Sequence, residues 1–368
     1  QALEMNVTGV QNTAVGSGAL EEQLTNSCTA VGFSALKANT TGAENTAMGS
    51  NALDANTTGN YNHAFGNNAL GANTTGHGNV AMGINALLLN STASYNVALG
   101  AFAMDANTTG TENVAIGVNA LTANTTANEN VALGAYALAA NTTGAHNVAV
   151  GHDAGKAITT GSYNIAIGRD AMQACTDGAS NVAVGSNALD ACVSGNNNVA
   201  IGDFSLTNYT GNGNTAVGHD SLNACTTGGE NTAVGNQALQ TSTTDSANTG
   251  IGYRALESCN GGDYNTAVGS RCVEDLTTGD YVTGVGYNAL HNNTTGNQNT
   301  AFGAQALFTN TTASHNTACG REALYANTTG TSNTAVGTDA MQSNTTGNYN
   351  TAVGHDALDA NTTASDNT

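Results

Sequence analysis

Proline and tryptophan are absent from the 368 residues, and basic side chains are scarce. Without proline, every backbone N–H remains available for hydrogen bonding, which suits stacked strands. Six Lys and Arg stand against 26 Asp and Glu, so the formal net charge is −20. A chain this acidic is unsuited to nucleic acid or to an anionic membrane surface. We therefore expect no nucleic-acid partner.

Other signals are missing as well. No apolar run reaches the 18 residues that a membrane span needs, and no charged-then-apolar leader is present, so we expect no membrane insertion. The seven cysteines form no Cys-x-x-Cys pair, and no histidine stands at zinc-like spacing from them. No Asp-rich calcium repeat occurs either. The sequence predicts neither a metal nor a cofactor.

A 17-residue repeat runs along the whole chain in about 22 copies. Its clearest copies read Asn-Thr-Ala-Val-Gly-x-x-Ala-Leu-x-x-Asn-Thr-Thr-Gly-x-x, and the glycine after Ala-Val recurs from Gly16 to Gly354. This anchor glycine serves below to number positions within a copy. Seventeen residues are too few for a helical hairpin but fit two short strands joined by two tight turns. The prediction is an all-β fold, an elongated parallel β-solenoid or β-roll.

No linker or charge block interrupts the repeat, so we predict one continuous domain over residues 1–368. Residues 152–290 form a variant stretch richer in Cys, Tyr and Arg. There the asparagine seven positions after the anchor gives way to residues such as Ile158, Cys175 and Cys192. The two cysteines fall on successive coils, within reach of a disulfide in principle, although buried thiols are the simpler interpretation.

Alternation within Thr-Ala-Val predicts which residues are buried. The first and third residues are apolar or Thr in almost every copy, so we expect them to face the core together with the Leu at position +4. The middle residue would then lie on the opposite face, yet it is Ala in every copy except at Gly250 and Gly284. This predicts close contact with another chain, and hence an intertwined or side-by-side homotrimer. The representative contact residues are Ala47, Ala64, Ala81, Ala149 and Ala183.

Asparagine precedes the anchor by four positions in nearly every copy. Side-chain amides stacked one coil apart can bond to each other, and Asn also suits tight turns. We predict a structural ladder rather than a ligand site at Asn45, Asn62, Asn79, Asn96, Asn113, Asn130 and Asn147.

No catalytic triad, phosphate-binding loop or carboxylate pair rises above the repeat, so we expect no enzyme activity. Function in a solenoid usually resides in residues that depart from the repeat. The chain's one concentration of aromatic and basic residues is a candidate binding patch for a cell-surface glycan or a host receptor, or else an interchain contact. It comprises Tyr253, Arg254, Tyr264, Arg271, Tyr281 and Tyr287.

The motifs "NTAVG" and "NVAIG", followed by "xxAL" and "NTTG", resemble repeats in the heads of trimeric autotransporter adhesins and in phage tail-fibre-type proteins. The resemblance covers essentially the whole chain. It implies a trimeric left-handed β-roll that projects from a surface and contacts a host or a neighbour. Autotransporter head coils are typically shorter than 17 residues, and neither their membrane anchor nor their coiled-coil stalk follows in this sequence.

The leading hypothesis is a non-enzymatic, extracellular structural and adhesive fibre shaft, at a cell surface or on a virion. A first alternative is a self-assembling filament whose subunits stack end to end, since the sequence stops within a coil at Thr368. A second alternative is an ice-binding solenoid, because Thr-Thr recurs once per coil. Adjacent Thr residues point to opposite sides of a strand and the doublet sits in a turn, which disfavours ice binding.

Overall fold

A computed structural model describes residues 1–368 and contains no helix. It confirms an all-β parallel β-solenoid of about 20 turns built on the 17-residue repeat. Accordingly, no segment forms a helix that could cross a membrane. The chain divides into two compact units, residues 1–183 and residues 184–368, and the variant stretch falls partly in each. One continuous repeat domain stays a prediction. Each unit is described by itself.

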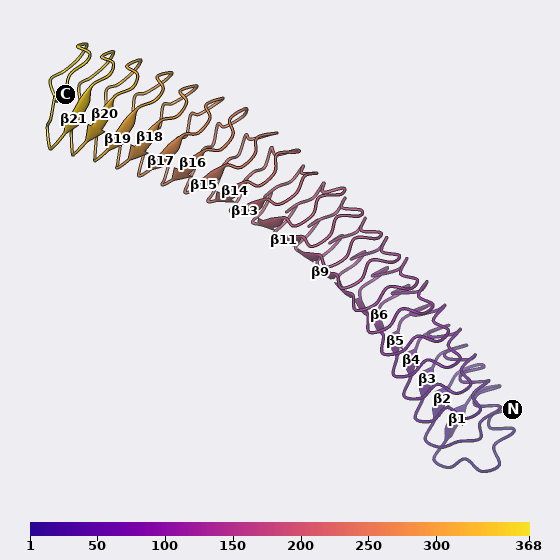
Figure 1. The fold of residues 1–368 in the computed structure, drawn as a ribbon. Coiled ribbons are helices and arrows are strands. Elements are labelled where there is room, and N and C mark those ends of the chain that lie inside the picture. The colour runs from indigo at the N-terminus through magenta and orange to yellow at the C-terminus, as the bar shows by residue number, and fades with distance from the viewer. The chain divides into compact units, whose positions relative to one another are not determined.

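Every strand has three residues and every complete coil contributes one strand (Figure 1). The strands of the first unit are β1 (Thr13–Val15), β2 (Thr29–Val31), β3 (Thr46–Met48), β4 (His63–Phe65), β5 (Val80–Met82), β6 (Val97–Leu99), β7 (Val114–Ile116), β8 (Val131–Leu133), β9 (Val148–Val150) and β10 (Ile165–Ile167). Strand β11 (Val182–Val184) includes the boundary. The second unit holds β12 (Val199–Ile201), β13 (Thr215–Val217), β14 (Thr232–Val234), β15 (Thr249–Ile251), β16 (Thr266–Val268), β17 (Thr283–Val285), β18 (Thr300–Phe302), β19 (Thr317–Cys319), β20 (Thr334–Val336) and β21 (Thr351–Val353).

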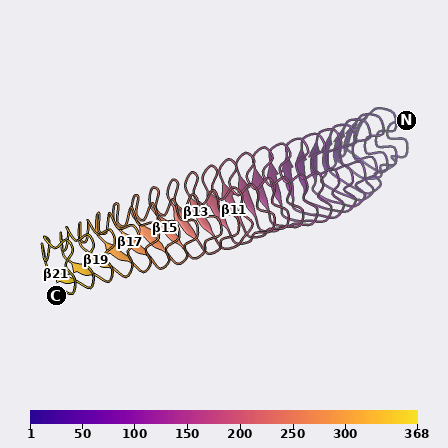
Figure 2. The same cartoon turned by 90° about the horizontal axis from the view of Figure 1, so that it is seen from above.

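Within each unit, successive strands pair in parallel and in register. Thr46 pairs with His63, and Ala47 pairs with Ala64, so equivalent repeat positions lie one above the other. Figure 2 shows the strands as a row with the remaining residues of each coil forming turns beside it. Because the period equals one coil, any repeat position becomes a column of stacked side chains.

Two coils are one residue short yet keep this register, as the pairs Thr13–Thr29 and Val199–Thr215 show. In both, the missing residue falls in the turn after position +7, where Gln23 or Tyr209 replaces the usual Asn. Both side chains are fully buried, and the Tyr209 hydroxyl donates to the carbonyl of Asn212 at 3.1 Å. The shortening is therefore absorbed by a turn and a larger side chain, while the strand row stays intact.

The predicted second strand is wrong. The segment after the anchor adopts left-handed backbone at positions +2 and +4, as at Asn51 (φ 54°) and Leu53 (φ 55°). It still hydrogen-bonds from coil to coil, with the Leu53 N–H donating to the Ala69 carbonyl at 2.9 Å. Left-handed backbone costs of order 1–3 kcal/mol for a residue like leucine, and the complete burial of the Leu53 side chain offsets that cost.

The predicted orientation of the strand is reversed. The middle residue faces the core of its own chain and its two neighbours face outward: Ala47 is fully buried, whereas Met48 is 44% exposed. The middle residue is small because the Leu at position +4 packs against it from across the coil. At Gly250, for example, an added Cβ would lie 3.4 Å from Leu239 and 2.9 Å from the Ala255 carbonyl oxygen.

The alanines predicted to contact another chain therefore cannot do so. A single chain already buries all five completely, namely Ala47, Ala64, Ala81, Ala149 and Ala183. The narrow interior of the coil, and not a neighbouring subunit, accounts for this small-residue column.

Two asparagine columns run through the interior and are fully buried. In the column four before the anchor, the Asn45 side-chain carbonyl accepts the backbone N–H of Asn62 at 2.9 Å, and the Asn45 amide donates to the Gly59 carbonyl at 2.7 Å. The same position holds Asn62, Asn79, Asn96, Asn113, Asn130 and Asn147. In the column seven after the anchor, amide bonds amide directly, as from Asn107 to Asn90 at 2.9 Å. These bonds satisfy polar groups that burial would otherwise penalise.

The anchor glycine sets how closely coils approach. Gly100 has φ 140°, and a Cβ at that position would lie 2.5 Å from the carbonyl oxygen of Gly117 in the next coil. We predict that Gly100→Ala lowers the free energy of unfolding by about 1–3 kcal/mol, measured by urea denaturation. Ala101→Ser, at the variable position beside it, is the control and should change stability little. An unfolding midpoint of Gly100→Ala equal to that of the control would contradict the proposed steric limit.

Asp245 stands where other coils have Gly or Ala and is only 3% exposed. Burial raises the pKa of its carboxyl above the ordinary value of 3.8, although the Ser242 hydroxyl partly opposes the shift. A raised folded-state pKa means that Asp245 costs stability above its unfolded pKa, and that the cost disappears as the pH falls below it. We predict that Asp245→Ala is more stable than the natural chain at pH 7 and loses this advantage near pH 4.

Thermal unfolding at both pH values measures the difference. The matched control is Asp177→Thr, which removes the same charge from an exposed residue. An Asp245→Ala advantage that is equal at the two pH values would show that the burial of the charge is not its cause.

Candidate functional sites

The outward side chains of the strands form an apolar row on each unit. In the first unit the exposed members include Val15 (58%), Met48 (44%), Met82 (50%), Leu133 (41%) and Ile167 (37%). In the second they include Ile201 (39%), Ile251 (39%), Phe302 (52%), Val336 (37%) and Val353 (71%). Among all outward strand positions, only His63 and the Cys319 thiol can ionise, and none is Asp, Glu, Lys or Arg. Contiguous exposed apolar surface of this kind is typical of an interaction site.

The predicted tyrosine and arginine patch falls into separate parts. Tyr253 and Tyr287 stand two residues after their strands, whereas Tyr264 and Tyr281 stand two residues before theirs. The two pairs therefore lie along opposite edges of the strand row, one where the strands begin and the other where they end. All four rings are between 44% and 58% exposed.

Tyr264 and Tyr281 are one coil apart and stack with ring centroids 5.3 Å apart and an interplanar angle of 3°. Tyr264 is 58% exposed and Tyr281 57% exposed. An exposed aromatic pair held in a fixed geometry is a suitable surface for the apolar face of a sugar ring.

The arginines of the patch are already paired with carboxylates. Arg254 contacts Glu257 at 2.8 Å and Glu274 at 3.1 Å, and Arg271 contacts Glu274 at 3.7 Å. His291 adds a further contact to Glu274 at 3.2 Å, and the Glu274 side chain is only 8% exposed. These contacts form a structural ion-pair network, so the two arginines are not available as a free anion-binding fork.

Three cysteine thiols of the variant stretch are not activated nucleophiles. Burial raises the pKa of Cys225, Cys259 and Cys272 to about 12, so these thiols stay protonated at neutral pH. Cys319, the outward residue that ends β19, is exposed.

The threonine doublets use one hydroxyl per coil for stacking. The Thr40 hydroxyl donates to the Thr57 carbonyl at 3.0 Å, and the Thr57 hydroxyl donates likewise to the Thr74 carbonyl at 3.0 Å. The second threonine of each doublet, as at Thr41 and Thr58, is exposed. Only one column of exposed threonine hydroxyls remains, and one column is a narrow surface for binding ice.

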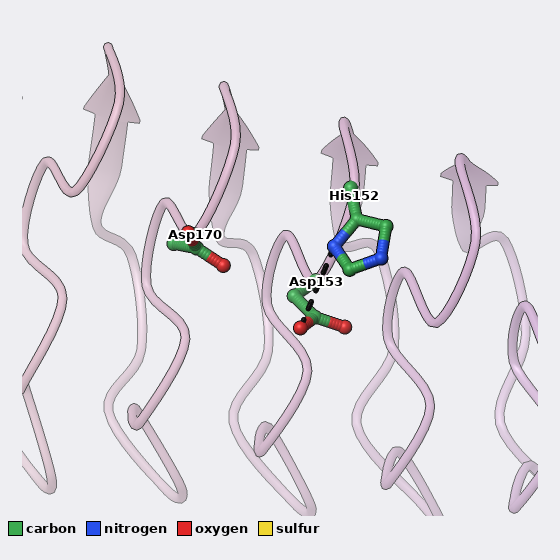
Figure 3. A group of neighbouring side chains, drawn as sticks. All are labelled: His152, Asp153 and Asp170. Carbon is green, nitrogen blue, oxygen red and sulfur yellow. Dashed lines mark ion pairs between the residues drawn. The ribbon is translucent and has the colours of Figure 1, made fainter.

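A histidine and two aspartates meet on the first unit (Figure 3). His152 and Asp153 follow β9 directly after its anchor glycine, and Asp170 occupies the position of Asp153 one coil later. One potential ligand atom from each residue lies within 4.8 Å of the other two. A second group of the same composition, Asp339, His355 and Asp356, occurs in the second unit.

The sequence predicted no metal because the three potential ligands do not lie together in one short segment. In a solenoid, residues one period apart become neighbours, so Asp153 and Asp170, 17 positions apart, are adjacent. The sequence signal for this cluster is an acidic pair in one repeat column with a histidine in the adjacent column.

No protein-family model matches this chain, and no curated protein matches it.

Proposed function

We propose that this chain is the shaft of a non-enzymatic extracellular fibre whose copies associate side by side through the outward strand face. The observation that supports this proposal is the row of exposed apolar residues, such as Met82 and Leu133, along the strands. Three copies in a closed ring are the favoured arrangement, because cyclic symmetry covers the face of every copy and leaves none exposed.

The charge distribution supports a second copy as the partner. Identical chains of net charge −20 repel one another unless the contacting surfaces carry little charge. The outward strand positions have no acidic residue at all. Contact through the strand face therefore buries apolar side chains without bringing carboxylates of the two chains together.

The strand face is large enough for a stable interface. Ten strands spaced by about 4.8 Å and about 10 Å long give one unit a flat face of roughly 480 Å². The rows of both units together offer about twice that area, which exceeds the roughly 800 Å² of each partner that a stable interface uses.

The resemblance of the "NTAVG" and "NTTG" motifs to adhesin heads and tail-fibre repeats supports an extracellular place, at a cell surface or on a virion. End-to-end stacking into a filament uses a different surface, the coil ends, and predicts particles many chains long. Chain mass in solution therefore separates a closed ring from a filament.

We predict that the natural chain is a discrete trimer and that Leu99→Glu with Leu133→Glu converts it into folded monomers. The two glutamates place charge in the outward row, where burial against another chain would cost several kcal/mol per unpaired ion. Light scattering coupled to size exclusion measures the chain number, and circular dichroism checks the fold.

The matched control is Thr109→Glu with Thr126→Glu, which adds the same charge at exposed turn positions of the same unit. It should remain trimeric. A natural chain that is a monomer at micromolar concentration, or a strand-face variant that is still trimeric, would refute the strand face as the interface.

Adhesive recognition is the second part of the proposal and is supported by the stacked pair Tyr264 and Tyr281. We predict that an array of surface glycans reveals at least one ligand, and that Tyr281→Ala weakens its binding by about tenfold, since one aromatic contact is worth of order 1 kcal/mol. Tyr349→Ala removes an exposed tyrosine from the same column, with no ring partner, and is the control. Equal binding by the two variants would exclude the stacked pair as the site.

A further inference from the structure

We propose that His152, Asp153 and Asp170 form a binding site for a divalent transition-metal ion, with Zn²⁺ as its typical occupant (Figure 3). The site is independent of the proposed fibre function. It lies wholly within the first unit.

The fold places the three side chains by its period. His152 and Asp153 occupy positions +1 and +2 after the anchor Gly151, and Asp170 occupies position +2 of the next coil. Both aspartates have left-handed backbone with φ 58°, which the repeat imposes at this position. In Figure 3 the Asp170 carboxylate extends toward Asp153, and the His152 ring stands beside Asp153.

The ligand atoms are close enough for one ion. They lie within 4.8 Å of one another. Ligands of a tetrahedral zinc ion with bonds of about 2.1 Å are roughly 3.4 Å apart. His152 Nδ1 already lies 3.5 Å from Asp153 Oδ2, and the His152 side chain is 58% exposed, so small rotations close the remaining difference.

A second observation points to a missing cation. Asp153 is only 8% exposed, and its Oδ1 atom is buried without a hydrogen-bond partner. Leaving a buried charged oxygen without a hydrogen-bond partner is unfavourable. Asp170 is 9% exposed, so two buried carboxylates face each other across one coil spacing. A cation between them would give the Asp153 Oδ1 atom a partner and reduce the repulsion between the two carboxylates.

Neighbouring side chains occupy the other oxygens and set the expected strength of binding. Lys156 Nζ lies 3.2 Å and Gln173 Nε2 3.4 Å from Asp153 Oδ2. Arg169 Nε lies 3.0 Å from Asp170 Oδ2, and Gln173 donates to Asp170 Oδ1 at 3.1 Å. Lys156 therefore competes with the metal for Asp153, and its removal should tighten metal binding.

The donor set selects the kind of metal. Calcium and magnesium take oxygen ligands almost exclusively, in sets of six or more for calcium. An imidazole with two carboxylates suits zinc and its transition-metal neighbours, with water completing the coordination. An ion at this place links two successive coils, so it stabilises the folded solenoid by mass action.

Two other groups in the chain provide comparisons. Asp339, His355 and Asp356 have the same composition, but His355 and Asp356 are more than half exposed, and neither aspartate has a buried oxygen without a hydrogen-bond partner. His219 and Asp220 form the same His–Asp pair, at 3.1 Å, with Phe204 and Gln237 in the adjacent positions instead of a second aspartate.

Zinc binding is measured by equilibrium dialysis of the full chain in a background of Asp339→Asn and Cys319→Ser, which removes the second group and the exposed thiol. The expected result is one bound Zn²⁺ per chain, weakened at least about tenfold by His152→Asn or Asp170→Asn. His219→Asn, at the matched pair, should leave it unchanged. Lys156→Met should tighten it.

Circular dichroism verifies that each variant is folded, and His152→Asn changes an exposed side chain that the core does not need. Calcium in place of zinc should give no saturable binding at the same concentration. The proposal is overturned if the background protein binds no zinc when the zinc concentration is 100 times the protein concentration. It is equally overturned if bound zinc is retained in both His152→Asn and Asp170→Asn.

Discussion

The close approach of one coil to the next at the anchor glycine is the constraint on which each unit depends. A Cβ at Gly117 would lie 2.9 Å from the Ala135 nitrogen of the next coil, so only glycine permits this spacing. Once the spacing is set, strands pair without a shift, as Val114 with Val131. In-register stacking then converts each repeat position into a column, and every column must contain a side chain that tolerates its own copy as a neighbour.

That requirement explains which residues the columns contain. An amide both donates and accepts, so asparagine can stack on itself indefinitely, as in the bonds from Asn73 to Asn56 and from Asn90 to Asn73. A carboxylate cannot, because like charges one coil apart repel. Acidic pairs one coil apart therefore need partners: lysine, arginine and glutamine surround Asp153 and Asp170, and Arg254 contacts both Glu257 and Glu274. The proposed metal ion would further reduce the repulsion between the Asp153 and Asp170 carboxylates.

The sequence was sufficient for the period and the parallel stacking, because both follow from repetition, and the bonding capacity of one side chain pointed to the asparagine ladder four positions before the anchor. It was insufficient for the direction of the strand. Alternation in Thr-Ala-Val separates two faces but does not say which is inside, and the usual preference for burying valine over alanine gave the wrong answer. The interior width decided it, since the Leu70 side chain from across the coil is buried at 0% exposure. The left-handed backbone at the leucines could not be predicted from the sequence either, because leucine has no propensity for that conformation.

The reversed strand changes the reason for expecting assembly. Alanine in the core needs no partner chain, so the small-residue column does not support the predicted trimer. The larger apolar residues that were assigned to the core are instead on the outside, as at Met82 and Phe302. Water in contact with a row of such side chains is unfavourable along the length of each unit, and the row has no charge to keep identical chains apart. The expectation of self-association is therefore retained, but it now depends on the opposite face of the same strands.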